Sequence, residues 1–141
     1  MRQPASASQG VTARAGVKDR LRGRTLAQWY CLAVAVLLGV RGATTLLFGA
    51  SFDQPGTGWR AIQQLAVAAV LIAAQRSSSR AYRVLVPFAL FYLVLWVVGI
   101  VNGHEAFGLI PINMRDKILY IAYAVVAALI LVLPSQRPRH D

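Results

Sequence analysis

Hydrophobic residues in this chain form four long blocks, and polar residues gather between the blocks and at the two ends. The blocks do not alternate apolar and polar positions as half-buried strands do. At a rise of 1.5 Å per residue, about 20 apolar residues in a helix cross the ~30 Å hydrocarbon core of a bilayer. The pattern therefore predicts an all-α, polytopic membrane protein with four transmembrane helices in a compact bundle.

The four blocks predict a transmembrane domain over residues 27–133, with helices at about 27–50, 59–75, 81–101 and 115–133. The segment 1–26 has no apolar run and is rich in Arg, Ser and Gly. Such a segment buries too little apolar surface to offset its ordering entropy. We therefore expect a disordered, basic cytoplasmic tail at 1–26, and a short cytoplasmic tail at 134–141.

Composition supports a membrane protein over a soluble one. The chain is 57% hydrophobic and 14% charged, whereas about a quarter of the residues of a soluble domain are charged. The composition therefore does not fit an ordinary soluble globular domain.

The distribution of basic residues predicts the orientation of the chain in the membrane. Eleven of the 15 Lys and Arg residues lie in the N-terminal segment, between residues 76 and 83, or after residue 136. Only Arg60, Arg115 and Lys117 stand at the opposite ends of the blocks. Cytoplasmic flanks are enriched in cations, so we expect a multi-pass protein of a bacterial cytoplasmic membrane with both termini inside. The net charge of +10 is then explained by the orientation of the chain in the membrane. Nucleic acid is therefore not expected as a partner.

Four cations stand directly before the first hydrophobic block, at Lys18, Arg20, Arg22 and Arg24. They could bind anionic lipid headgroups, at about 1 kcal/mol per charge. The favoured alternative is that they only anchor the inner end of the first helix.

Arg41 is the one basic residue near the middle of a hydrophobic block, since the others stand near block ends or outside the blocks. An arginine at the centre of a span costs about 2.5–3.5 kcal/mol on insertion scales. Its side chain therefore snorkels outward, pairs with Gln63, Gln64 or an outer acid, or serves a transport or ligand role. The candidate acids are Asp53, Glu105 and Asp116.

The connection before the last block carries two further candidate features. Asn113 followed by Asp116 has the spacing of a capping box, which predicts the start of the last helix. Pro111 keeps the preceding residue out of a helix, so the chain before it should be extended or turned. His104 beside Glu105 could bind a metal or accept a proton, but a solvated loop pair is the favoured interpretation because a metal site needs more ligands.

Small and aromatic residues predict how the helices pack. Ile62, Ala66, Ala69 and Ala73 fall on one helix face and would let a neighbouring helix approach closely. Packing within the chain is favoured over dimerisation through this face. Tyr120, one turn before Tyr123, is expected to pack inside the bundle with a satisfied hydroxyl, the alternative being a platform for a ligand.

The last block begins with a recognisable motif, in which Phe107, Gly108, Pro111, Asn113, Asp116 and Leu119 fit the pattern F-G-x-x-P-x-N-x-x-D-x-x-L-H. This resembles the signature of a family of small actinobacterial four-span membrane proteins of unknown function. The resemblance implies four helices and a membrane location over about residues 27–133. Tyr120 stands where that family has histidine, and the N-x-x-H of other members is missing from the second block.

No catalytic signature is present in the sequence. The chain has two histidines and one cysteine, too few for a histidine-ligated haem or a multi-cysteine cluster. We expect no cofactor and no enzymatic activity. The expected function is an accessory or structural component that binds a membrane-protein partner or a second copy of itself, and the alternative is a small transporter or channel acting as an oligomer.

Overall fold

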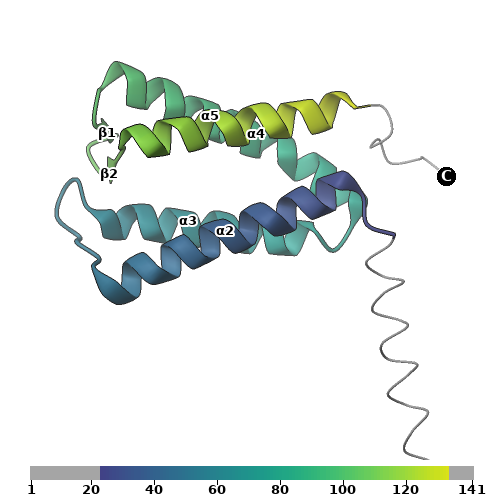
Figure 1. Ribbon diagram of the computed structural model, residues 1–141, viewed down its shortest axis with the longest axis horizontal. Coiled ribbons are helices and arrows are strands. Elements are labelled where there is room, and N and C mark those ends of the chain that lie inside the picture. The colour runs from purple at the N-terminus through teal and green to yellow at the C-terminus, as the bar shows by residue number, and fades with distance from the viewer. Residues whose placement is uncertain (1–22, 134–141) are drawn as a thin grey trace, which may run out of the picture.

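The computed structural model describes residues 23–133, which contain four α-helices and one short β-hairpin (Figure 1). The helices are α2 (Leu26–Phe48), α3 (Thr57–Ala74), α4 (Ser78–Val101) and α5 (Met114–Val132), labelled as in Figure 1. Each predicted bound lies within three residues of the observed one, and the all-α class is confirmed. The expected tails lie outside the described residues, except for residues 23–25, which precede α2, and Leu26, which is its first residue.

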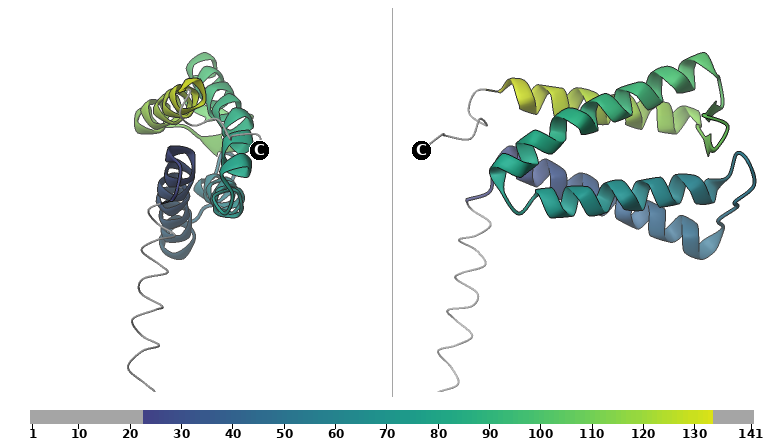
Figure 2. Two further views of the ribbon diagram at one scale, coloured as in Figure 1. Left: turned by 90° about the vertical axis from the view of Figure 1, so that its right-hand side faces the viewer. Right: turned by 180° about the vertical axis from the view of Figure 1, so that it is seen from behind.

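The helices form two antiparallel hairpins. Helix α2 packs mainly on α3, and α4 packs mainly on α5, with the tight turn 75–77 joining the two pairs. Figures 1 and 2 show that α2 begins and α5 ends at the same end of the molecule. The connections 49–56 and 102–113 lie together at the opposite end. We call these the inner end and the outer end, after the predicted orientation.

A capping box fixes the start of α2 and ties it to the turn between the hairpins. The hydroxyl of Thr25 accepts from the backbone N–H of Gln28, and the Gln28 side chain accepts from the backbone N–H of Thr25 at 3.0 Å. The side-chain Nε2 atom of Gln28 also donates to the backbone carbonyl oxygen of Gln75 at 2.9 Å. Capping satisfies backbone groups that a helix end leaves unpaired. These contacts therefore stabilise the start of α2 and hold it against the turn between the hairpins.

Glycine and alanine let α2 and α3 approach closely. A Cβ atom added at Gly42 would lie 2.8 Å from Cγ of Leu65 and 2.9 Å from the carbonyl oxygen of Ala61. At Gly39 the nearest atom would be Cβ of Ala68, at an ordinary 3.9 Å. Gly42 is therefore the position at which a side chain cannot fit without moving the neighbouring helix.

The small-residue face of α3 does not pack within the chain, so that expectation is wrong. Ile62, Ala66, Ala69 and Ala73 are all exposed. Helix α3 instead buries the face that carries Ala61, Gln64, Ala68 and Leu71, because α2 and α4 reach it from that side. The exposed face is called the α3 stripe below.

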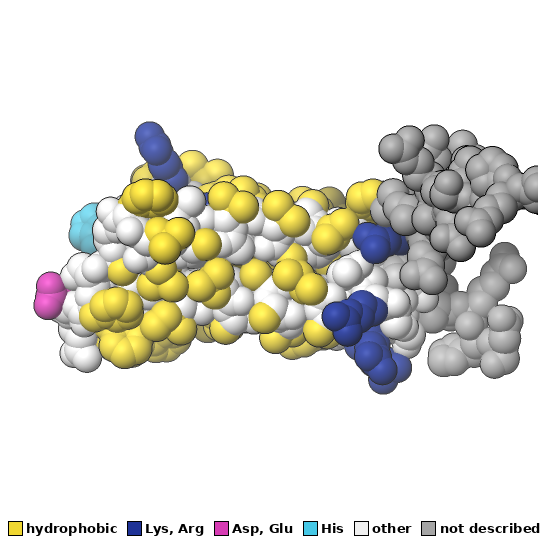
Figure 3. All heavy atoms as spheres, turned by 90° about the horizontal axis from the view of Figure 1, so that it is seen from below, with side chains coloured by type: hydrophobic (Ala, Val, Ile, Leu, Met, Phe, Trp, Pro, Cys, Tyr) yellow, Lys and Arg dark blue, Asp and Glu magenta, His cyan; other side chains and the backbone are white. Residues whose placement is uncertain are grey.

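The sides of the helical bundle expose many apolar side chains, as contact with lipid requires. Figure 3 shows hydrophobic side chains along the middle of one face, with the basic side chains towards its ends. Large hydrophobic side chains are exposed on all four helices, including Val40, Val70, Leu90 and Leu129, which are each 55–60% exposed. Soluble monomers rarely expose so much apolar surface.

Three helices, α2, α3 and α4, are long and apolar enough to cross a membrane. Helix α5 carries Arg115, Asp116 and Lys117 in its first turn. The uncharged stretch that remains, 118–132, spans only about 22 Å at 1.5 Å per residue, less than the ~30 Å hydrocarbon core. A fourth span, which α5 would supply, therefore stays a prediction.

Replacing Gly42 by alanine should destabilise the bundle, and replacing Gly39 by alanine should not. We expect Gly42→Ala to lower the free energy of unfolding by about 1–3 kcal/mol, because an overpacked contact forces neighbouring atoms apart. Gly39→Ala has room for its methyl group, and alanine favours a helix over glycine by about 1 kcal/mol. Equilibrium unfolding in mixed micelles measures both, and an equal loss in the two variants would contradict the close contact.

Candidate functional site

Three charged side chains from three helices meet near the outer end of the bundle. Nη2 of Arg41, on α2, donates to Oδ1 of Asp116, on α5, at 3.0 Å. Nη1 of Arg60, on α3, donates to Oδ2 of the same carboxylate at 2.7 Å. We call this group the charged triad, and it joins the two helical hairpins.

The carboxylate at the centre of the triad is almost completely buried. The Asp116 side chain is 2% exposed, whereas those of Arg60 and Arg41 are 13% and 33% exposed. Removing a carboxylate from water is costly unless hydrogen bonds and opposite charge replace the lost hydration. Here both oxygens accept from a guanidinium group, so the burial of Asp116 depends on the two arginines.

Asp116 reaches this position because it stands in the first turn of α5. Its Oδ2 atom accepts from the backbone N–H of Asn113 at 3.2 Å, within the capping box that opens the helix. A carboxylate near a helix N-terminus is also stabilised by the helix dipole. The capping box expected from the Asn113 and Asp116 spacing is confirmed.

A small hairpin positions the start of α5. Strand β1 (Glu105–Ala106) pairs antiparallel with β2 (Ile110–Pro111), around a turn in which Phe107 and Gly108 have φ values of 57° and 69°. The expectation that the chain before Pro111 is extended or turned is confirmed. The buried side chain of Ile112 then packs over Gly99 of α4, where an added Cβ would lie 3.0 Å from its Cδ1.

The two outer connections also touch each other. The backbone N–H of Gly56, before α3, donates to the carbonyl oxygen of Leu109 in the turn of the hairpin at 3.1 Å. This hydrogen bond and the charged triad both join α2–α3 to α4–α5 at the outer end.

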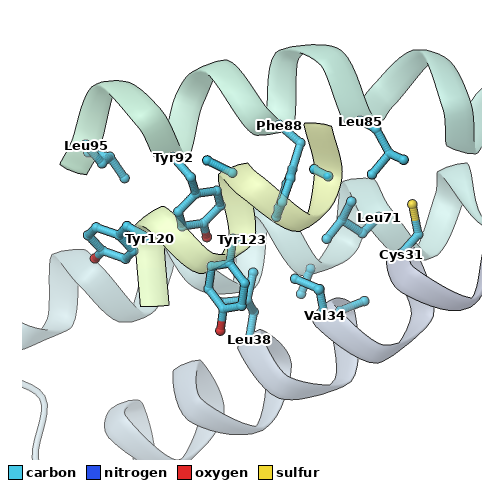
Figure 4. Close-up of a cluster of buried hydrophobic side chains, with 14 of the residues drawn as sticks. Cys31, Val34, Leu38, Leu71, Leu85, Phe88, Tyr92, Leu95, Tyr120 and Tyr123 are labelled. Carbon is cyan, nitrogen blue, oxygen red and sulfur yellow. The ribbon is translucent and has the colours of Figure 1, made fainter. Parts of the chain in front are cut away.

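A cluster of aromatic rings lies on the inner side of the triad. The ring of Tyr92, on α4, lies 4.8 Å from Phe88 and 5.3 and 5.2 Å from Tyr120 and Tyr123 of α5, centre to centre. Figure 4 shows these rings meeting between the two helices. Rings at these separations and angles attract each other beyond simple burial. The cluster therefore holds α4 and α5 together, and Tyr30 of α2 joins it by donating to the carbonyl oxygen of Tyr123 at 2.7 Å.

Several buried polar atoms in this cluster are left without a partner. The hydroxyls of Tyr120 and Tyr123 and Oε1 of Gln63 make no hydrogen bond among the described residues. Nε2 of Gln63 donates to the hydroxyl of Tyr92 at 3.3 Å. Tyr120 packs in the bundle as expected, but the expectation of a satisfied hydroxyl is wrong, because no group within residues 23–133 forms a hydrogen bond with it.

A family model for a domain of unknown function, DUF4383, matches residues 54–133. The chain belongs to this family. The match confirms the resemblance to an uncharacterised family, whereas the four-span signature and the actinobacterial origin stay predictions. In this DUF4383 chain, Arg60 and Asp116 lie inside the matched segment, and Arg41 lies before it. No match was found among curated proteins or among solved structures.

The remaining candidates do not join the triad in this DUF4383 chain. His104 is exposed and Glu105 is half-buried, both in the outer hairpin region. Gln64 is buried at 2% exposure on the packed face of α3. Within residues 23–133, no three His, Cys, Asp or Glu side chains lie close enough together to hold a metal ion.

Sequence reasoning named one arginine of the triad and missed the other. Pairing with an outer acid was among the three alternatives for Arg41, and the structure selects Asp116 from the three acids. Arg60 was interpreted as an ordinary outer cation. Its position in the first turn of an apolar helix, one turn before Gln63 on the same face, was the signal that could have placed it in the interior.

Replacing Asp116 by asparagine should strongly destabilise the protein. The substitution keeps the shape of the side chain but leaves both arginines without a counter-charge, and removing one partner of a buried ion pair costs about 3–5 kcal/mol. Glu105→Gln is the matched control, because Glu105 makes no ion pair with any described residue. Unfolding in mixed micelles measures both, and a wild-type free energy of unfolding in Asp116→Asn would show that the triad contributes nothing.

Proposed function

We propose that this protein is a non-enzymatic accessory or structural component of a membrane complex. It spans the cytoplasmic membrane with four helices, and both termini face the cytoplasm. The observation that supports this proposal is the exposed α3 stripe, a surface suited to a partner helix that no segment between residues 23 and 133 covers.

The stripe is suited to helix contact for a physical reason. Helices in a bilayer gain little from hydrophobicity, since lipid tails are equally apolar, and associate where small side chains let their backbones approach. Ala66, Ala69 and Ala73 provide such a surface along about two turns of α3. We propose that a neighbouring transmembrane helix of another protein lies over Ile62 and Ala69, on the side of the stripe away from α4, because Ala66 and Ala73 also border a hollow between α3 and α4.

The charged triad favours a structural role over transport. A transporter in which Arg41 lines a polar pathway needs that guanidinium free to meet a substrate. Arg41 instead donates to the buried Asp116, and both oxygens of the carboxylate are taken by arginines. The charges at the outer end thus hold helices together, which is the property of a scaffold.

The charge distribution supports the proposed orientation. The basic side chains of the inner end are Arg24, Arg76, Arg80 and Arg83. Counted along the whole sequence, eleven Lys and Arg residues stand before α2, at 76–83 or after α5, against Arg60, Arg115 and Lys117 at the outer end. Cations are enriched on the cytoplasmic side of membrane proteins.

Gentle extraction of the tagged protein from its native membrane should recover one defined partner at a fixed stoichiometry. We expect Ala69→Phe to lose this partner, because a ring on the α3 stripe holds the neighbouring helix away. Val125→Phe, at a 46% exposed site on α5, is the matched control and should keep it. Native mass spectrometry measures the complexes, and a pure monomer or homo-oligomer from wild-type membranes would overturn the accessory role.

A reporter fused after Asp141 should be active only in the cytoplasm. The same reporter inserted between Gly103 and His104, in the outer connection, should be active only outside. A cytoplasmic signal from the outer insertion, or an external signal from the C-terminal fusion, would reverse the orientation or remove the fourth span.

A further inference from the structure

An apolar groove runs along the surface between α3 and α4. Its middle part, with a volume of about 250 Å³, is lined by Ala66 and Val70 of α3 and by Pro87 and Phe91 of α4, among others. A second hollow of about 340 Å³ continues it towards the inner end and shares Val70 with it. The two hollows adjoin, since both are lined by Val70 and Val84, and both are open to the side, where the lipid of the membrane would lie.

The inner end of this groove is basic. Arg80 and Arg83, both exposed, line the second hollow beside Ala73. Nη2 of Arg83 donates to the hydroxyl of Ser79 at 2.9 Å, which holds its guanidinium along the first turn of α4. An apolar groove thus ends at two cations at one level of the bundle.

The charges at this end lack compensation within the described residues. No acidic residue stands in the first turn of α4, and the N-cap Ser77 makes no side-chain capping bond. Cations at a helix N-terminus are repelled by the positive end of the helix dipole. Neither Arg80 nor Arg83 forms an ion pair with a described residue. An anion placed here would offset the repulsion between each arginine and the positive end of the helix dipole.

We propose that the groove between α3 and α4 binds one anionic phospholipid from the inner leaflet. One acyl chain lies in the apolar part beside Pro87 and Phe91, and the phosphate group sits between Arg80 and Arg83. This site differs from the basic segment before α2, because it combines charge with a groove for the chain.

The shape and charge of the groove favour a lipid over a second copy of this protein. Any of the four helices of another copy would bring its own apolar surface but no acid to the two arginines, since within residues 23–133 the acids stand at the outer half. A phospholipid supplies both an apolar acyl chain and an anionic phosphate group in one molecule. Charge complementarity therefore selects the lipid.

The test compares the affinities of the full-length purified protein for phosphatidylglycerol and phosphatidylcholine with identical chains, by native mass spectrometry in detergent. We expect phosphatidylglycerol to bind more tightly, with one lipid per chain. Arg80→Gln with Arg83→Gln should weaken phosphatidylglycerol binding about 25-fold, since each cation near an anionic headgroup contributes about fivefold. Arg24→Gln with Arg76→Gln removes the same charge from the same end, outside the groove, and should change binding less than about threefold because salt screens distant charges.

A second pair of variants tests the acyl-chain part without changing the charge. Ala66→Phe fills the groove and should weaken phosphatidylglycerol binding about tenfold, as expected when about two methylene groups lose their protein contacts. Ala69→Phe is on the same helix but does not line the groove, and should bind as wild type does.

Three outcomes would overturn the proposal. If both arginine pairs weaken binding equally, the lipid senses only the basic surface. If Ala66→Phe has no effect, the groove holds no chain. If the wild-type protein is a dimer that Ala66→Phe dissociates, the groove is occupied by a second copy. The site stands only if both groove variants lose the lipid and both controls keep it.

Discussion

A buried carboxylate between two arginines organises the outer end of this protein. Asp116 lies on one helical hairpin, whereas Arg41 and Arg60 lie on the other. None of the three side chains can be buried alone, because an isolated charge in hydrocarbon costs several kcal/mol. The hairpins must therefore come together for the charges to leave water. Their contact fixes which turns of α2, α3 and α5 lie at the same height along the bundle.

The two ends of the bundle differ in how their charges are satisfied. At the outer end, the acid and the arginines bind one another and the connections are hydrogen-bonded across the hairpins. At the inner end, Arg80 and Arg83 stand beside an open groove and have no acidic partner among residues 23–133. The outer end is thus a closed structural unit, and the inner end and the α3 stripe are the surfaces left to meet lipid and protein. A scaffold in the membrane needs this combination.

Sequence patterns predicted what depends on local structure and failed where tertiary geometry decides. Hydrophobic blocks placed all four helices, and the spacing of Asn113 and Asp116 placed the capping box, because both depend on neighbours along the chain. The partner of Arg41 and the role of Arg60 depend on which faces meet across the hairpins. Helix periodicity identified the α3 stripe but could not tell whether it faces the chain or the outside, since small residues suit both.

The central claim is that Arg60 and Asp116 stabilise the protein through each other. A double-mutant cycle with Arg60→Gln, Asp116→Asn and the double variant, followed by unfolding in mixed micelles, measures that coupling directly. We predict a coupling free energy of about 0.5–3 kcal/mol, as found for residues that share one hydrogen-bond or ion-pair network. Effects that add to within about 0.5 kcal/mol, the behaviour of independent sites, would contradict the claim that this pair joins the hairpins.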